Sequence, residues 1–277
     1  MNVAILGSGA MGVQLALLCA LRGNPVVLWN HQKREGLPKT LKNIAILNAR
    51  LGFISKDEID HAIARISYSQ HLEFVSGCEL IIEAVSEDYS IKSKLIKSVC
   101  QYVKKSTIIS TNSSTISTTL LATNCSNPER FIGLHFFNPP FVRDIVEIIK
   151  GEQTSGEIIQ RANNFCESLQ RHVVIMDESP GFIVNRVLFP MINESIFLLS
   201  ETKIEAKEID TSMKRATGNP MGPLELADFI GLDICLNILE TLAQETGDQK
   251  YRPAPLLKRL VRAGKLGRKS KNGFYKY

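Results

Sequence analysis

The chain has 277 residues, of which 44% are hydrophobic and 22% are charged, and its formal net charge is +5. This composition is typical of a globular protein with apolar material for one large domain or two ordinary ones. No apolar run reaches the roughly 20 residues of a membrane-spanning helix, and the charge is too small to indicate nucleic-acid binding, so we expect neither partner.

The cysteines and the first residues bear on metal binding and location. The six cysteines are scattered singly, without a Cys-x-x-Cys pair or a histidine at metal-ligand spacing, so we expect free thiols and no metal site. A strand-like segment begins at Asn2, which leaves no room for a targeting peptide and predicts a cytoplasmic protein. The most basic stretch, residues 258–271, has no aromatics among its charges and fits a solvated helix face better than a polyanion site.

The first 30 residues predict a dinucleotide-binding unit. A strand at residues 3–6 leads into a Gly-x-Gly-x-x-Gly turn, a helical stretch that ends near Gly23, and a second strand at residues 25–29. The first glycine of such a turn permits tight bending, the second lets the backbone approach a pyrophosphate, and the third lets helix and strand pack closely. The helix N-terminus then offers free N–H groups to the anion. We expect four residues of this turn to bind the cofactor: Gly7, Gly9, Met11 and Gly12.

The second strand ends at Asn30, where an NAD-binding unit usually has Asp or Glu to hold the adenosine ribose. An amide can accept a hydrogen bond from the 2′-hydroxyl, but it does not repel a 2′-phosphate as a carboxylate would. Lys33 and Arg34 follow closely and could meet that phosphate. The residues leave NAD and NADP open, with a mild preference for NAD.

After Asn30 the pattern predicts an inserted helical hairpin. Apolar residues recur at helical spacing over residues 37–51, and Ser55 to Glu58 has the pattern of a capping box for a second helix through Ile66. The polar side of this hairpin is better interpreted as a solvent-exposed face than as a binding surface for the phosphate-bearing tail of a substrate. The basic residues on it are Lys39, Lys42 and Arg50.

The rest of the chain divides into two patterns. Strands alternate with helices up to residue 180, and a capping box at Thr154 to Glu157 opens one of the helices, so we predict an α/β fold with a doubly wound, mostly parallel, Rossmann-like sheet. From Ser179-Pro180-Gly181 onward the periodicity is helical, in four stretches without a convincing strand. We therefore expect a dinucleotide-binding domain at residues 1–180 and an all-helical C-terminal domain at residues 181–277. The predicted strands after the hairpin are residues 78–85, 106–111, 130–135, 144–149 and 172–176, with a helix at 91–103; the C-terminal helices are residues 181–199, 204–217, 224–245 and 254–263.

Polar residues follow several of these strands. Open α/β sheets bind ligands at the carboxyl ends of their strands, so we expect these residues to line one rim beside the glycine turn. His135 alone, in an apolar run, would be interpreted as a core residue. Its place on this rim, with Glu147 on the following strand, favours proton transfer instead. The other rim residues are Glu83, Glu87, Asn112, Ser113 and Ser114.

Eight segments, taken together and in order, resemble the short-chain L-3-hydroxyacyl-CoA dehydrogenases, most of all the bacterial 3-hydroxybutyryl-CoA dehydrogenases. They span nearly the whole chain: LGSGAMG, IIEAVSED, STNSST, GLHFFNPP, VEII, SPGFIVNR, NPMGPLELADFIGLD and GRKSKNGFYKY. The resemblance implies an NAD(P)-dependent oxidoreductase of fatty-acid metabolism (β-oxidation) that moves a hydride between the nicotinamide and C3 of a short-chain (3S)-3-hydroxyacyl-CoA or its 3-oxo form. It also implies a homodimer formed through the helical domain.

The resemblance assigns roles residue by residue. His135 matches the general base, and Glu147 matches the carboxylate that orients it. Ser114 matches the hydroxyl that contacts the substrate's 3-oxygen beside the cofactor, and Asn185 matches an amide at the domain junction. The resemblance thus implies four catalytic residues: His135, Glu147, Ser114 and Asn185. The matched cofactor residues are Glu87 and Lys92, near the nicotinamide ribose, with Asn112 and Ser114 close by and Asn30 at the adenosine ribose.

Three positions depart from the family pattern. Asn30 replaces the ribose-binding acid, and Ser113-Ser114-Thr115 replaces Thr-Ser-Ser with every hydroxyl kept. Residues 140–145 read PFVRDI in place of an x-Pro-x-Met-Lys-Leu run, so Asp144 stands where a lysine is usual. This change leaves open an alternative, the same chemistry on a hydroxyacyl group carried by an acyl carrier protein. A nucleotide-binding module without catalysis is a third hypothesis, which the intact proton-transfer residues disfavour.

Overall fold

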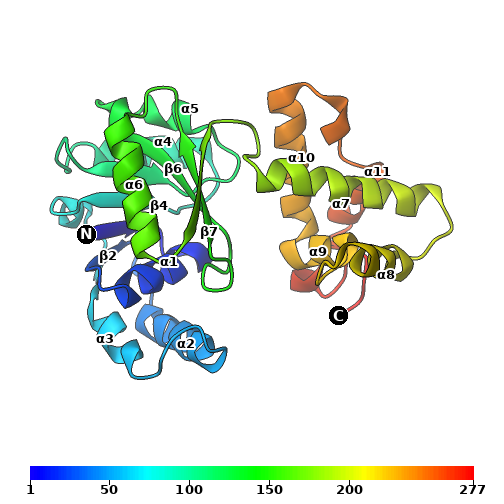
Figure 1. Cartoon of the computed structure of the whole chain (residues 1–277), viewed down its shortest axis with the longest axis horizontal. Helices are drawn as coiled ribbons and strands as arrows, with labels where there is room; N and C mark the ends of the chain where they lie inside the picture. The colour runs from blue at the N-terminus through cyan, green and yellow to red at the C-terminus, as the bar shows by residue number, and fades with distance from the viewer. The chain divides into compact units, whose positions relative to one another are not determined.

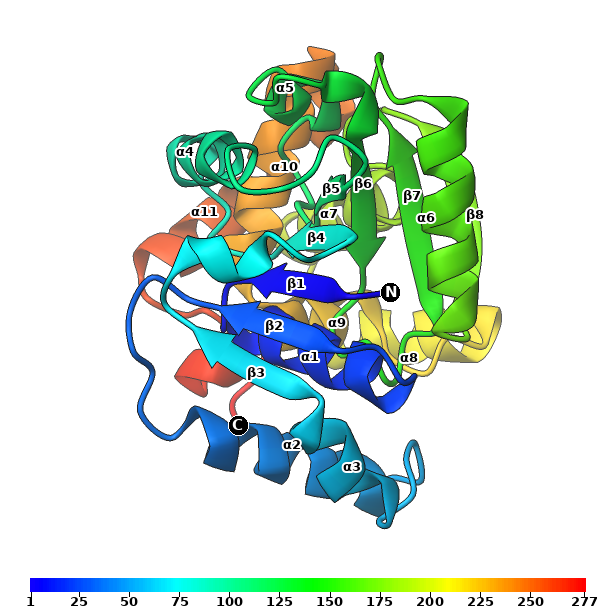
Figure 2. The ribbon, with the colours of Figure 1, turned by 90° about the vertical axis from the view of Figure 1, so that its left-hand side faces the viewer.

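The computed structural model describes all 277 residues, and the chain divides into two compact units, Met1–Glu178 and Ser179–Tyr277 (Figure 1). The first unit holds an eight-stranded sheet, with strands β1 (Val3–Leu6), β2 (Val26–Trp29), β3 (Ile66–Ser69), β4 (Leu80–Glu83), β5 (Ile108–Thr111), β6 (Phe131–Phe136), β7 (Ile145–Lys150) and β8 (His172–Asp177). Their order is β3-β2-β1-β4-β5-β6-β7-β8 (Figure 2). Neighbours are parallel except β6 and β7, which are antiparallel. This is the mostly parallel sheet predicted.

Helices cover both faces of this sheet, because alternate side chains of a strand point to opposite faces. Ile5 and Leu134 pack in a core on one face with four of the unit's six α-helices. Leu6 and Phe131 pack in a second core on the other face with the remaining two α-helices. The first face carries α1 (Ala10–Leu21), α2 (Leu37–Arg50), α3 (Glu58–Ala64) and α6 (Gly156–Ser168); the second carries α4 (Tyr89–Val99) and α5 (Thr118–Ala122).

The helical hairpin predicted between the second and third strands is present as α2 and α3, but its end differs from the prediction. Ile66 was expected in the second helix and instead begins β3, an edge strand that pairs with β2 in parallel. Only Ile66 of its four residues is buried, so the segment has too little apolar alternation to be recognised as a strand. Backbone pairing with β2 decides its conformation. The helix expected at residues 91–103 is α4, which begins at Tyr89 and ends at Val99.

The two predicted capping boxes form differently. Glu58 accepts a hydrogen bond from the Ser55 N–H at 3.1 Å, as a capping box requires, but the N-cap residue of α3 is Asp57 rather than Ser55. Ser155 rather than Thr154 caps α6, because the Thr154 hydroxyl donates to the Phe131 carbonyl at 2.7 Å. Both differences are shifts of one or two residues at a helix end.

The second unit contains five helices around one core, where the sequence predicted four. They are α7 (Val184–Glu201), α8 (Ala206–Thr217), α9 (Pro223–Ile230), α10 (Leu232–Thr246) and α11 (Pro255–Arg262). The predicted stretch 224–245 is interrupted at Gly231, whose φ of 109° is accessible to glycine at little cost. Asp228, beside this break, accepts hydrogen bonds from the Phe274 and Tyr275 N–H groups and so anchors the C-terminal segment.

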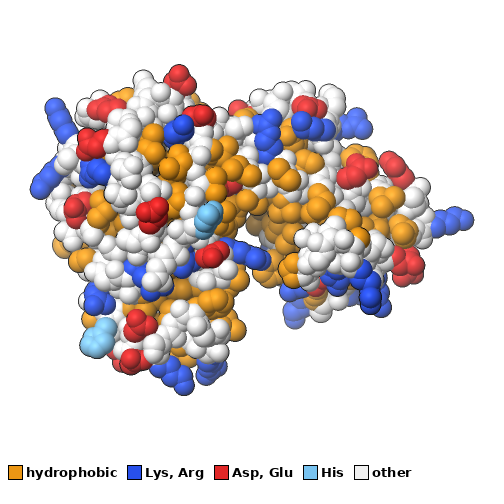
Figure 3. Space-filling model, in the orientation of Figure 1, with side chains coloured by type: hydrophobic (Ala, Val, Ile, Leu, Met, Phe, Trp, Pro, Cys, Tyr) orange, Lys and Arg blue, Asp and Glu red, His pale blue; other side chains and the backbone are white.

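The surface carries charges of both signs. Basic and acidic side chains are interspersed on the face drawn in Figure 3, in keeping with the small net charge. None of the helices combines the length and apolarity required to span a bilayer.

Candidate active site

The glycine turn between β1 and α1 has the geometry expected of a nucleotide cradle. Gly7 has a φ of 113°, and a Cβ there would lie 2.6 Å from the Ala84 carbonyl oxygen. A Cβ on Gly12 would lie 1.9 Å from the Gly7 oxygen, so this position must be glycine for α1 to pack on the turn. By contrast, a Cβ on Gly9 would meet nothing within 4 Å. Gly9 therefore leaves an open approach to the backbone.

A pocket of about 590 Å³ lies at this turn, and its lining includes Gly7, Gly9, Asn30 and Val85. Its size is within the range of small-molecule sites. Gly9 is the N-cap of α1 and no side chain caps the helix, so first-turn N–H groups remain for an anionic ligand. Met11 lies in this first turn and packs against the core that contains Ile5 and Leu134. The residues present fit a dinucleotide.

Asn30 lies between two pockets. It lines the pocket at the glycine turn and also a second one of about 420 Å³, which Lys33, Arg34 and His71 line as well. The Asn30 amide N–H donates to the Gln32 carbonyl at 2.7 Å. No carboxylate lines the second pocket, so it is a cationic space beside the expected ribose position.

His135, Glu147 and Ser114 form a hydrogen-bonded chain at the end of the sheet. His135 and Glu147 are register partners in β6 and β7. The His135 Nδ1 lies 2.7 Å from Glu147 Oε2, and its Nε2 lies 3.0 Å from the Ser114 hydroxyl. The side chains of His135 and Glu147 are buried, whereas Ser114 is half-buried. The structure thus brings together three of the four predicted catalytic residues.

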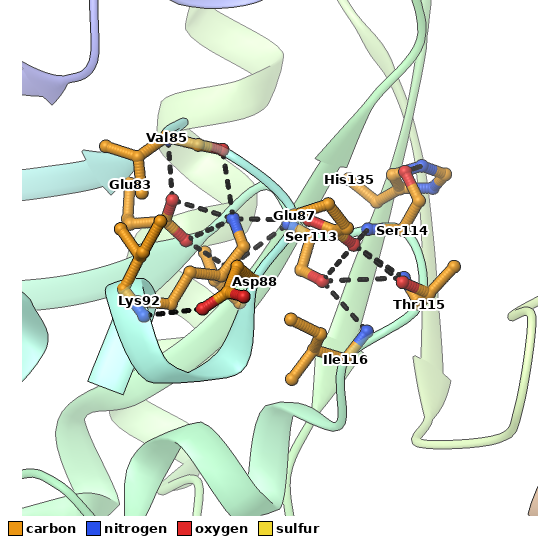
Figure 4. Close-up of polar contacts among 12 residues, drawn as sticks. Glu83, Val85, Glu87, Asp88, Lys92, Ser113, Ser114, Thr115, Ile116 and His135 are labelled. Atoms are coloured by element: carbon orange, nitrogen blue, oxygen red, sulfur yellow. Dashed lines mark hydrogen bonds and ion pairs between the residues drawn. The ribbon is translucent and has the colours of Figure 1, made fainter. Parts of the chain in front are cut away.

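A carboxylate organises the loop that carries Ser114 (Figure 4). Glu87 Oε1 accepts hydrogen bonds from the Ser113 hydroxyl, the Ser114 N–H at 2.8 Å, and the Thr115 N–H and hydroxyl. Burial acts to raise the pKa of Glu87, but the Lys92 charge and these hydrogen bonds outweigh it and hold the pKa below its ordinary value. Glu87 therefore stays ionised and fixes the position of Ser114.

Lys92 joins Glu87 to a carboxylate whose role the sequence did not assign. The Lys92 ammonium, 1% exposed, lies 2.7 and 2.9 Å from the two oxygens of Glu83 and 3.2 Å from Glu87. Glu83 is fully buried and also accepts from the Thr111 hydroxyl at 2.7 Å. One signal could have indicated this pair: Lys92 shares the apolar face of α4 with Ile96, and Glu83 ends an apolar strand.

The other predicted site residues lie outside the hydrogen-bonded chain of Ser114, His135 and Glu147. The Asn112 side chain accepts from the Phe136 N–H at 2.9 Å, so it links the ends of β5 and β6 beside His135. Asn185 lies in the second unit, buried in the first turn of α7. Arg143 and Asp144 are exposed in the turn between β6 and β7. Gly7, Gly9 and Asn30 line the pocket at the glycine turn, whereas Glu87, Lys92 and Asn112 do not.

A glycine-turn pocket and a carboxylate–histidine–hydroxyl chain on one rim of a doubly wound sheet are the features of a nicotinamide-dependent dehydrogenase that acts on an alcohol. Family comparison narrows this class. Residues 2–179 match the model of the 3-hydroxyacyl-CoA dehydrogenase NAD binding domain, and residues 181–277 match that of the 3-hydroxyacyl-CoA dehydrogenase C-terminal domain. The chain belongs to the 3-hydroxyacyl-CoA dehydrogenase family and is an NAD-dependent oxidoreductase.

Individual relatives agree with the family. The chain is 41% identical to the probable 3-hydroxybutyryl-CoA dehydrogenase of Deinococcus radiodurans, with 100% of both chains covered, and 33% identical to the human mitochondrial hydroxyacyl-coenzyme A dehydrogenase, covering 100% of this chain and 91% of that one. The crystal structure of (S)-3-hydroxybutyryl-CoA dehydrogenase PaaH1 from Ralstonia eutropha superposes with a TM-score of 0.95 at 38% identity, covering 100% and 98% of the two chains. The fold and the family predicted from the sequence are confirmed.

Proposed function

We propose that the chain interconverts (3S)-3-hydroxybutyryl-CoA and acetoacetyl-CoA with NAD as the cofactor. The observation that carries the proposal is the chain from Ser114 through His135 to Glu147, which has the geometry of a positioned general base. Relatives of similar length that carry the name 3-hydroxybutyryl-CoA dehydrogenase support the short acyl group. The names of the relatives reported above give no support to the alternative of a carrier-protein thioester.

The side chains of Ser114, His135 and Glu147 account for the proton transfer. With Nδ1–H donating to Glu147, His135 presents the lone pair of Nε2 toward Ser114. An alcohol bound by the Ser114 hydroxyl therefore meets Nε2, which takes its proton as C3 becomes a carbonyl. Bound NAD supplies the acceptor for the hydride that leaves C3. In the reverse direction the same nitrogen returns the proton to the 3-oxygen.

We assign the cofactor to the glycine-turn pocket in the first unit. Gly9 gives the pyrophosphate access to the backbone and to the first turn of α1. Glu87 binds Lys92 and the Ser114 N–H, so this pair lies beside Ser114, where the nicotinamide ribose is expected, and Asn112 holds the neighbouring strand ends together. In the second unit, Asn185 is assigned to the catalytic residues through the family resemblance.

NADP is the second candidate cofactor, because Lys33 and Arg34 line the pocket that adjoins Asn30 and no carboxylate does. The ratio of kcat/KM for NADH and NADPH distinguishes the two. We expect NADH to be preferred and Asn30→Asp to enlarge that preference. A preference for NADPH in the wild type overturns the assignment of NAD.

The substrate is tested by NADH oxidation with acetoacetyl-CoA, a longer 3-oxoacyl-CoA, and acetoacetyl groups carried on pantetheine or an acyl carrier protein. We expect the highest kcat/KM with acetoacetyl-CoA. No turnover of any thioester would refute the proposed function, and preference for the carrier-protein thioester would refute its CoA form.

We also propose a cytoplasmic homodimer that associates through the second unit. Large apolar side chains are exposed there, including Val187, which is 71% exposed, and Leu198. Light scattering after gel filtration tests the association. Val187→Asp should give monomers, whereas Val142→Asp, an exposed valine of the first unit, should leave dimers.

A further inference from the structure

Two cysteines of the first unit have their thiols in contact. The sulfur of Cys100, at the end of α4, lies 3.0 Å from that of Cys125, which follows α5. Both views of the ribbon show α4 and α5 side by side (Figures 1 and 2). Cys100 is partly exposed, whereas the four remaining cysteines are buried in the cores; these are Cys19, Cys78, Cys166 and Cys235. The pair is therefore the thiol site that a small reagent reaches first.

A buried cation lies beside the pair. Arg130 is 3% exposed, its Nη1 donates to the Lys104 carbonyl, and its Nε has no hydrogen-bond partner. A buried guanidinium with an unpartnered N–H favours a negative charge close to it. No carboxylate forms an ion pair with Arg130. A thiolate would be the missing counter-charge.

The two thiols have opposite tendencies. The hydrogen bond between the two sulfurs, helped by Arg130 and opposed by burial, lowers the pKa of Cys100 to about 7. The same hydrogen bond and burial raise the pKa of Cys125 well above its ordinary value. Cys100 is thus the thiolate and Cys125 the thiol that shares its proton with it.

We propose that Cys100 and Cys125 are a reactive dithiol that hydroperoxides convert into an intramolecular disulfide, with Cys100 as the attacking sulfur and Cys125 as the resolving sulfur. The Cys100 thiolate attacks one oxygen of ROOH, an S–O bond forms as the O–O bond breaks, and the leaving RO⁻ takes up a proton to give ROH. The Cys125 sulfur then displaces hydroxide from the Cys100 sulfenic acid, and its own proton completes a water molecule. The two sulfurs lose two electrons, which reduce ROOH to ROH and water.

The cross-link would enclose the loop that carries Ser114. Residues 100–125 contain β5 and the whole serine loop, and α4 carries Lys92. A disulfide would fix the end of α4 to the end of α5, on both sides of that loop, without adding a group to it. The proposed chemistry of the dithiol does not depend on the proposed function, because it needs neither the cofactor nor a substrate.

Peptide mapping of the full chain tests the site. The reduced chain is treated with equimolar hydrogen peroxide, free thiols are alkylated, and tryptic peptides are analysed without reduction. We expect two of the six thiols to disappear and peptide 98–104 to be linked to peptide 106–130, with both thiols restored by dithiothreitol. Six unchanged thiols, a link to another cysteine, or a link between two chains would overturn the proposal.

Variants separate the two roles. Cys125→Ser should stop at a Cys100 sulfenic acid, which dimedone labels, whereas Cys100→Ser should give neither the label nor the link. Cys235→Ser is the matched control, since Cys235 is buried in the core of the second unit, and it should form the same link as the wild type. Dimedone labelling of Cys125 in place of Cys100 would reverse the assigned roles and overturn the proposal.

Discussion

His135 and Glu147 are directly paired residues of the only antiparallel strand pair in the sheet, with Nδ1 2.7 Å from Oε2. Side chains that face each other across antiparallel strands lie on the same face with their Cβ atoms about 5 Å apart. The reversal of direction between β6 and β7 therefore delivers the carboxylate to the imidazole.

Replacement of His135 tests the proton transfer. We expect His135→Asn to lower kcat about 100- to 10,000-fold, the range of general-base contributions, and to leave NADH affinity unchanged. His172→Asn, on an exposed position of β8, is the matched control and should keep wild-type kcat. A similar loss in both variants would show that the effect is not specific to the site.

Removal of the Ser114 hydroxyl tests its contact with the 3-oxygen. We expect Ser114→Ala to reduce kcat/KM for acetoacetyl-CoA by about 100-fold, as for the loss of one hydrogen-bond donor that stabilises developing charge. Ser168→Ala removes an exposed hydroxyl at the end of α6 and should have no effect. Wild-type kinetics in Ser114→Ala would contradict the assigned role.

The buried Lys92 is expected to matter for stability. Lys92→Met removes the ion-pair partner of the buried Glu83, so the free energy of unfolding should fall by about 3–5 kcal/mol. The double variant Glu83→Gln/Lys92→Met removes both charges and should lose less. Urea unfolding without cofactor measures each value, with Lys97→Met, on the exposed side of α4, as the control. If the free energy of unfolding falls as much in the double variant as in Lys92→Met, or more, the two charges are not a coupled pair.

Gly9 separates folding from cofactor binding. An added Cβ there meets no protein atom within 4 Å, so Gly9→Ala should unfold at the same urea concentration as the wild type. The same methyl group would stand where the pyrophosphate approaches, and we expect the Kd for NADH to rise by about tenfold or more, or about 1.4 kcal/mol. Gly156→Ala, also free of contacts, should change neither quantity. Unchanged NADH binding in Gly9→Ala would place the pyrophosphate elsewhere.

The ionisation of Glu87 predicts how stability varies with pH. Its folded-state pKa lies below the ordinary 4.5, so its contribution is fully present above pH 4.5 and is lost as the pH falls through the folded-state value. Below pH 4.5, the free energy of unfolding should therefore fall less steeply in Glu87→Gln than in the wild type. Glu157→Gln, which removes an exposed carboxyl, serves as the control. An identical slope in Glu87→Gln and the wild type would mean that the serine loop does not bind the ionised form.

Local patterns sufficed for much of the fold and for the residue types of the site. The glycine turn, the apolar strands and the helical periodicity are short-range features, since each follows from contacts within a few residues. Ile66 and Gly231 show where such patterns fail. β3 exists because its backbone pairs with β2, and the helical stretch through Gly231 is interrupted by one backbone conformation that no periodicity reveals.

The sequence by itself determined the class of sheet, the family, and the candidates His135, Glu147 and Ser114, because these are carried by motifs. Only the tertiary structure decided which groups touch. It brought the Ser114 hydroxyl within hydrogen-bond distance of His135 Nε2, buried Lys92 against Glu83, and brought the thiols of Cys100 and Cys125 into contact. Such contacts join segments far apart in the chain, and their distances depend on how whole strands and helices pack rather than on any local pattern.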